Sequence, residues 1–115
     1  MNQKEILLKN IAEFIKEAKE AAINKSFNSS VTLYFKALVV IADYHILVNE
    51  GSIPKNHTER FNILRTKYRL IYEILDKDFP IYQNSYRIAL GKSYCEVLEN
   101  DTKKLIAITK INLNI

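Results

Sequence analysis

The chain has 115 residues, 48% hydrophobic and 26% charged, which suits one globular domain spanning residues 1–115 rather than a disordered segment. Two glycines and two prolines are too few turn formers for a β-sandwich or barrel, and they cannot build the G-x-G-x-x-G or Walker A phosphate loops. The net charge of +4 is compatible with a polyanionic partner and equally with a solvated basic surface, because the basic residues are scattered and form no tail.

An amphipathic pattern predicts the first helix from about Gln3 to Ile23. Apolar side chains recur there at helical spacing, and charged side chains fill the opposite face. The apolar stripe consists of Leu7, Ile11, Phe14, Ala18 and Ala22. Residues 24–26 form a short polar break after this helix.

The second predicted helix, from about Phe27 to Glu50, is apolar on two faces, as the central helix of a bundle usually is. Gly51 is a natural C-terminal cap, and Pro54 prevents the helix from resuming at once. One stripe consists of Val31, Phe35, Leu38, Ala42 and Ile46, and the second face carries Tyr34, Ile41 and Val48.

The third helix is predicted from His57 to about Leu75, with a break expected near Arg69. Asn56 has the context of an N-cap, with Glu59 three residues later as its reciprocal partner. The apolar positions are Phe61, Leu64, Tyr68, Ile71 and Leu75.

Residues 76–80 are interpreted as a connector or as the start of the fourth helix, with Asp78 as its cap and Pro80 in its first turn. That helix is predicted from about Ile81 to Leu90, ending at Gly91.

The fifth helix is predicted from Tyr94 to about Lys110, after a capping box formed by Ser93 and Glu96. Its apolar residues are Val97, Leu98, Leu105, Ile108 and Ile111. Residues 111–115 alternate like a strand and are interpreted as a fraying or partner-contacting tail. Together these patterns predict an all-α fold, an up-and-down bundle of about five helices.

Cys95 is the only cysteine, which excludes an intrachain disulfide and a cysteine-based zinc cluster. We interpret it as a buried hydrophobe in a reducing compartment, since no base that would activate a catalytic thiol is evident. The N-terminus lacks the apolar run of a secretory signal, and the longest apolar cluster, residues 37–42, is too short to span a bilayer. We therefore expect a soluble, cytoplasmic protein with no membrane partner.

Motifs for catalysis or metal binding are not evident in the sequence. His45 and His57 are the only histidines, and H-E-x-x-H is absent, so neither a metal site nor a cofactor is predicted. His45, next to Tyr44 on the second helix, is assigned a packing role. No serine lies in a G-x-S-x-G context, and no carboxylate pair indicates glycosidase or phosphoryl-transfer chemistry.

The start of the third helix is the first candidate binding site. Lys55, His57 and Arg60 place positive or protonatable groups around a helix N-terminus, whose free N–H groups favour an anion. His57 and Arg60 share one helical face. We therefore predict a phosphate or nucleotide site here. The alternative is that Asn56 and Glu59 satisfy the N–H groups and the basic side chains only meet water.

A tyrosine–arginine group in the fourth predicted helix is the second candidate. Tyr82 and Tyr86 share a helical face next to Arg87. Tyrosine beside arginine can stack bases and hold phosphates, so Tyr86 and Arg87 are candidate nucleotide-binding residues. The same side chains also pack well in a core or a dimer interface, and both interpretations stay open.

Several local features follow one another in a characteristic order. A long apolar helix begins with the aromatic-rich segment 33–38 and ends in a turn at Gly51. The next helix starts with Lys55-Asn56-His57, and Tyr86-Arg87 precedes the last helix. In this order the chain resembles the HEPN domains, the higher-eukaryote and prokaryote nucleotide-binding family, over roughly residues 5 to 110.

The resemblance implies a four- or five-helix up-and-down bundle, commonly a dimer, associated with RNA cleavage or with a nucleotidyltransferase partner in toxin–antitoxin-like pairs. Ribonuclease members carry an arginine followed a few residues later by a histidine. Here every arginine lies after both histidines, so that motif is absent and a non-catalytic member fits better.

Three hypotheses about function follow. The first is a non-catalytic HEPN-like domain that dimerises and binds a nucleotide, nucleic acid such as RNA, or a nucleotidyltransferase partner. The second is a metal-independent ribonuclease using His57 with Arg60 or Arg87, and the third is a structural or adaptor dimer without a ligand. The homodimer is expected because the second helix is apolar on two faces and the tail is rich in isoleucine.

Overall fold

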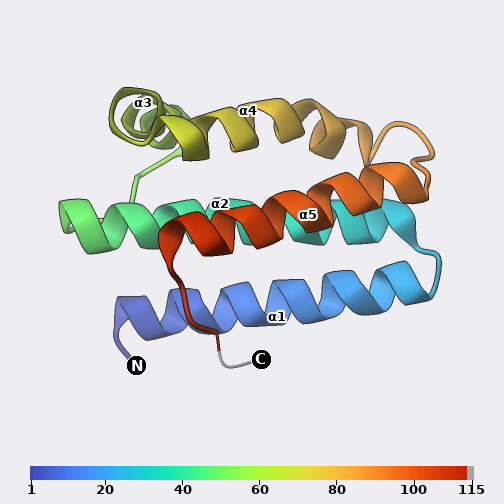
Figure 1. The fold of residues 1–115 in the computed structure, drawn as a ribbon, viewed down its shortest axis with the longest axis horizontal. Helices are drawn as coiled ribbons and strands as arrows, with labels where there is room; N and C mark the ends of the chain where they lie inside the picture. Colours follow the sequence, from blue (N-terminus) through green and yellow to red (C-terminus); the bar gives the residue numbers. More distant parts are fainter. Residues whose placement is uncertain (114–115) are drawn as a thin grey trace.

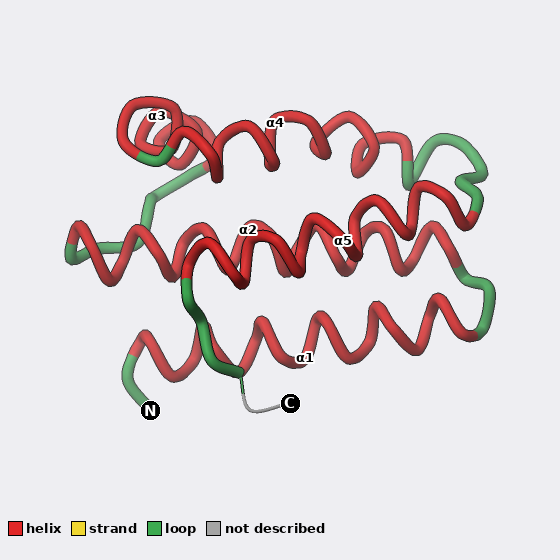
Figure 2. The backbone as a smooth tube through the Cα atoms, viewed as in Figure 1, coloured by secondary structure: helices red, strands yellow, loops and turns green. Residues whose placement is uncertain are grey.

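The computed structural model describes residues 1–113, which contain five helices (Figures 1 and 2). They are α1 (Gln3–Ile23), α2 (Phe27–Glu50), α3 (His57–Lys67), α4 (Arg69–Asn84) and α5 (Lys92–Thr109). In Figure 1, α1, α2, α4 and α5 run alternately in opposite directions, whereas the short α3 is seen nearly end-on beside the start of α4. The predicted all-α, up-and-down helical bundle is confirmed.

The central helix is α2, because it packs against α1, α4 and α5. Its first predicted stripe is completely buried, and Tyr34 and Ile41 of the second face are buried as well, while Val48 stays exposed. Gly51 caps the helix with φ 90°, a left-handed conformation that a residue with a β-carbon rarely adopts. The predicted bounds and C-cap of this helix are thus confirmed.

The length and composition of α2 would also allow it to cross a membrane, and it is the only such helix within residues 1–113. Its most apolar 18-residue window has a mean hydropathy of 1.6, so the short cluster at residues 37–42 understates its apolar length. In the structure 56% of that window is buried inside the bundle. Burial at the centre of a helical bundle is therefore enough to account for this composition.

The predicted third helix is divided in two at Tyr68. This residue has φ −132° and ψ 65°, which ends α3, and α4 begins at Arg69. The expected break near Arg69 is therefore confirmed, one residue earlier.

Both interpretations of residues 76–80, a connector or the start of a helix capped by Asp78, are wrong, because these residues lie inside α4. Pro80 lacks the N–H that would bond to a carbonyl one turn earlier, yet the helix continues to Asn84. The apolar period persists across the proline, with Ile71 and Leu75 buried before it and Tyr82 packed on the core after it. Tertiary burial thus outweighs the local signals for a break.

The fourth helix predicted over 81–90 is also wrong, since α4 ends at Asn84 and the chain then forms a connection to α5. α5 begins at Lys92 with Gly91 as its N-cap and has no side-chain cap bond, so the Ser93–Glu96 capping box is not formed. Glu96 instead pairs with Lys92, with 3.8 Å between Nζ and Oε1.

The end of the chain packs on the bundle as far as the structure describes it. Lys110 caps α5 in the left-handed conformation, Ile111 is buried, and Leu113 packs against the core. Residues 111–113 form no strand. Asn114 and Ile115, the rest of the predicted strand-like tail, lie outside the described residues.

A pair of buried carboxylates joins α4 to α5. Asp78 is fully buried and Asp101 is 3% exposed. Lys77 bridges them, with Nζ 3.0 Å from Oδ1 of Asp78 and 2.6 Å from Oδ2 of Asp101. Burial, together with the adjoining Asp101, raises the pKa of Asp78 to about 7, against the opposing charge of Lys77. Near neutral pH, Asp78 therefore retains its proton in part of the molecules.

Replacing Asp78 by asparagine should stabilise the protein more at about pH 8 than at about pH 4.5. The folded state keeps a proton on Asp78 that the unfolded chain has already released. The contribution of Asp78 to the free energy of unfolding therefore falls as pH rises from about 4 to 7, by at most about 1.4 kcal/mol per pH unit. Asparagine is neutral throughout. Urea unfolding of both proteins at the two pH values measures the difference, with the exposed Asp76→Asn as control. An equal effect of Asp78→Asn at both pH values would contradict the assignment.

Candidate functional site

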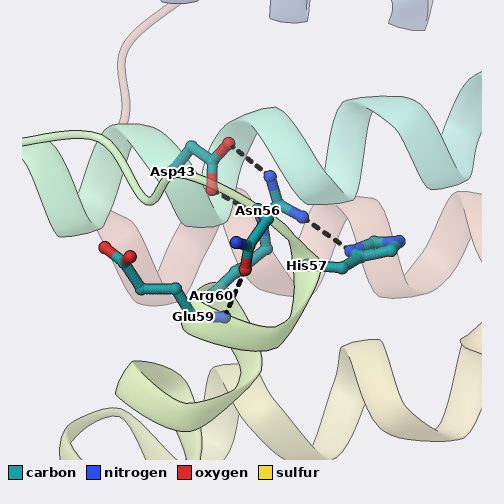
Figure 3. Close-up of polar contacts among 5 residues, drawn as sticks. All are labelled: Asp43, Asn56, His57, Glu59 and Arg60. Atoms are coloured by element: carbon teal, nitrogen blue, oxygen red, sulfur yellow. Dashed lines mark hydrogen bonds and ion pairs between the residues drawn. The ribbon is translucent and has the colours of Figure 1, made fainter.

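A bidentate ion pair joins α2 to α3 (Figure 3). Nε of Arg60 lies 2.7 Å from Oδ1 of Asp43, and Nη2 lies 2.9 Å from Oδ2. The two side chains are only 12% and 11% exposed. Two parallel charge-assisted bonds fix the guanidinium plane as well as its position. Arg60 is therefore held by Asp43 and does not extend freely into solvent.

His57 lies on the other side of Arg60 (Figure 3), with Nδ1 2.6 Å from Nη1 of the guanidinium. Because a guanidinium only donates, Nδ1 is the acceptor and the ring proton belongs on Nε2. Burial, and then the charge of Arg60, lower the pKa of His57, with Asp43 acting in the opposite direction. Both effects favour the uncharged imidazole, which offers one donor, Nε2–H.

The predicted N-cap of α3 is confirmed. The Glu59 N–H donates to Oδ1 of Asn56 at 2.9 Å (Figure 3), and the Arg60 N–H donates to the Asn56 carbonyl at 3.0 Å. These two N–H groups are already bonded. Lys55 is exposed and makes no ion pair with any residue in 1–113. Of the three basic or protonatable residues predicted at this corner, Lys55 is thus the one whose charge faces solvent unpaired.

Aromatic rings connect this corner with the end of α4. The His57 ring meets the edge of Phe79 at a centroid distance of 5.6 Å, Phe79 lies 6.2 Å from Tyr82, and Tyr82 lies 5.9 Å from Tyr86. We call these four rings the aromatic row. The guanidinium of Arg87 lies 5.6 Å from the centroid of the Tyr86 ring. The two candidate groups are therefore the two ends of one continuous feature.

A hollow of about 290 Å³ opens beside the aromatic row. Its apolar wall includes Phe35, whose ring stacks on Tyr82 at 4.7 Å with planes 16° apart. Lys36 and His57 are the polar members of the lining, and Lys36 is exposed without an ion pair in the described chain. The full lining consists of Phe14, Phe35, Lys36, Val39, Val40, His57 and Tyr82. An apolar wall with one cation and one N–H donor suits a flat ring that carries an anionic group.

Sequence analysis missed Lys36, Asp43 and Phe35 as members of this site. A usable signal was present, since Lys36 and Asp43 are the only charged residues between Val31 and Val48. A charge on a helix that is otherwise apolar all round must face solvent or meet a partner. Here Lys36 faces solvent at the hollow, and Asp43 meets Arg60.

The other two singled-out side chains have structural roles. His45 packs edge-on against Tyr68 at 4.9 Å, which confirms its packing role, and burial lowers its pKa. Cys95 is buried with Sγ 3.0 Å from Oγ of Ser30, which confirms it as a buried side chain. Within residues 1–113, no three His, Cys, Asp or Glu side chains gather so that they could hold a metal ion.

No protein-family model, no curated protein and no solved structure matches this chain.

The pKa of His57 should respond in opposite directions to changes at its two charged neighbours. Arg60→Gln removes the cation that disfavours the imidazolium, so the pKa should rise. Asp43→Asn removes the anion that favours the imidazolium, so it should fall. Titration of the imidazole ring protons by NMR measures both shifts, and His45, packed against Tyr68 instead, is the internal control. Shifts of the same sign in the two variants would contradict the arrangement.

Proposed function

We propose that the chain is a non-catalytic, HEPN-like helical domain that binds a nucleotide or single-stranded RNA. The observation that carries the proposal is the hollow beside the aromatic row, with Lys36 and His57 among its apolar walls. Aromatic walls suit the face of a nucleobase, and an ammonium and an N–H donor suit its phosphate. At about 290 Å³ the hollow is at the lower end of small-molecule sites, which favours one nucleotide over a dinucleotide cofactor.

The aromatic row extends this proposal from one nucleotide to a strand. A strand that leaves the hollow along the row would contact the exposed ring of Tyr86 and the guanidinium of Arg87. Such stacking tolerates different bases, because every base has an aromatic face. Arg60 acts indirectly in this proposal, since its guanidinium is bound to Asp43 and orients His57.

A non-catalytic role is supported by the charges around His57. Cleavage of RNA without a metal needs a base and a cation that stabilises the charged transition state. The cation next to His57 is Arg60, whose charge is largely neutralised by the carboxylate of Asp43. The arginine-before-histidine order of ribonuclease members is also absent.

A metal-independent ribonuclease is the second candidate, and the 2.6 Å contact between His57 and Arg60 is the observation that favours it. It places a histidine and a cation together, as that chemistry requires. Degradation of RNA by the purified protein, abolished by His57→Ala, would replace the non-catalytic proposal.

Lys36→Gln should weaken binding of a nucleotide such as AMP about fivefold, and it should reduce the salt dependence of RNA binding by about one phosphate contact. Lys103→Gln, which removes an exposed charge on α5 away from the hollow lining, is the matched control. An NMR titration of the wild type should shift amides near Lys36, His57 and Tyr82. Equal affinities for the two variants, or shifts confined to other regions, would overturn the proposal.

We also propose a homodimer, but through a different surface from the one that the sequence indicates. The apolar faces of α2 are largely buried within one chain, and so is Ile111 of the tail. The large apolar side chains that stay exposed on α4 and α5 are Leu70, Tyr94, Val97 and Ile108. We therefore propose that two chains meet through α4 and α5. Light scattering that gives a monomer mass at micromolar concentration would remove this part.

A nucleotidyltransferase partner is proposed on the HEPN resemblance alone. Co-purification with a small nucleotidyltransferase encoded next to this chain would support the toxin–antitoxin-like pairing. Failure of the two to associate when produced together would remove it.

A further inference from the structure

Asn28, in the first turn of α2, holds the connection between α4 and α5. Its Nδ2 donates to the carbonyl of Ser85 at 2.7 Å and to that of Ile88 at 2.6 Å. Its Oδ1 accepts from the Leu90 N–H at 2.9 Å. Both amide hydrogens and the amide oxygen are thus used on the backbone of one connection. The backbone path of the connection is consequently held by Asn28, a residue far away in the sequence.

Further bonds hold the start of this connection. Oγ1 of Thr32, one turn beyond Asn28, lies 2.8 Å from Oγ of Ser85, which is buried. Ser85 Oγ also donates to the Tyr82 carbonyl at 2.6 Å. The N–H groups of residues 87 and 88 both donate to the Asn84 carbonyl at 3.0 Å. The backbone of residues 85–90 is therefore bonded at its beginning, middle and end.

The side chains of residues 86–89 nevertheless face solvent, whereas those of Ser85 and Leu90 are buried. Tyr86 is 63% exposed, Ile88 is 55% exposed, and the Arg87 side chain, also exposed, lies over the Tyr86 ring. Packing alone does not require an exposed tyrosine beside an exposed arginine, although any partly buried connection needs its backbone groups bonded in this way. A binding loop gains from it, because a backbone already ordered loses less conformational entropy when a ligand binds.

We infer that Asn28 is a positioning residue for ligand binding: through the backbone of residues 85–90 it holds Tyr86 and Arg87 in place at the end of the aromatic row. Asn28 itself does not belong to the hollow or to the row. The inference rests on the proposed function, because the ligand is the single-stranded RNA proposed above.

The decisive experiment is a double-mutant cycle on binding of a short single-stranded oligouridylate to the full chain. Asn28→Ala should lower the affinity about as much as Arg87→Ala, roughly three- to tenfold, and should add less than about twofold in the Arg87→Ala background. Ser29→Ala, at the neighbouring exposed position, is the control and should bind like the wild type. Wild-type affinity of Asn28→Ala, or effects of the two changes that multiply fully, would overturn the inference.

Hydrogen exchange without RNA tests the anchoring separately. The Leu90 amide should exchange at least about tenfold faster in Asn28→Ala, whereas the amides of α1 keep their wild-type rates. If Asn28→Ala does not fold, Asn28→Ser, an uncharged variant whose side chain is too short to replace all three amide bonds, is expected to lower RNA affinity in the same way. An unchanged Leu90 exchange rate in Asn28→Ala would overturn the inference.

The outcomes separate the two proposals. If Arg87→Ala weakens RNA binding and Asn28→Ala does not, only the positioning role is overturned. If neither Arg87→Ala nor Lys36→Gln changes RNA affinity, the proposed function fails, and the positioning role fails with it, whatever the Leu90 exchange rate.

Discussion

A carboxylate on the central helix of a bundle has to be paired, and this requirement at Asp43 organises the candidate site. Leaving a charge unpaired in a dry environment is costly, so Arg60 of α3 meets it with two bonds. That pairing fixes α3 on α2 and makes the third guanidinium nitrogen available to His57. The tautomer of the imidazole, and with it the position of its one N–H donor, therefore depends on an aspartate one helix away.

The second buried acid is accommodated differently. Asp78 has no arginine partner among residues 1–113 and shares Lys77 with Asp101. Its raised pKa indicates that the charge of Asp78 is removed by protonation in part of the molecules. Asp43 is thus compensated by two direct bonds to one guanidinium, whereas the protonation of the pair between α4 and α5 changes with pH. The first supports the site, and the second sets how firmly the two helices behind the aromatic row are joined.

The proposed binding surface is formed by residues from several separate elements. Phe35 and Lys36 come from α2, His57 from α3, Tyr82 from α4, and Arg87 from the connection that Asn28 holds. Each contributes one kind of interaction: an aromatic wall, a cation or an N–H donor. His57 and the backbone that carries Arg87 are positioned by side-chain bonds between elements, Phe35 and Tyr82 are positioned by ring stacking, and Lys36 extends into solvent.

The sequence by itself determined the elements whose causes are local. Periodic burial set the bounds of α1 and α2, Gly51 ended α2, and Asn56 started α3. Cys95 and His45 were correctly assigned to packing, and Lys55, His57, Arg60, Tyr86 and Arg87 were singled out from residue type and spacing. Helix bounds and caps need only neighbours within a few turns of helix, and the assignments of single residues follow from residue type and spacing, so a pattern in the chain is sufficient to find them.

Only the tertiary structure decided what depends on distant partners. Pro80 and the acidic residues near it indicated a break, but burial of one face keeps α4 helical. Residues 85–90 have a helical pattern, but the Asn28 side chain of α2 forms hydrogen bonds with their backbone and they form a connection instead. The partner of Arg60 lies 17 residues away on another helix, and the hollow lies among side chains of α1, α2, α3 and α4. A side chain that bonds to a distant element produces no periodic pattern in the sequence. Single members of the site can therefore be predicted from the sequence, whereas their arrangement in space cannot.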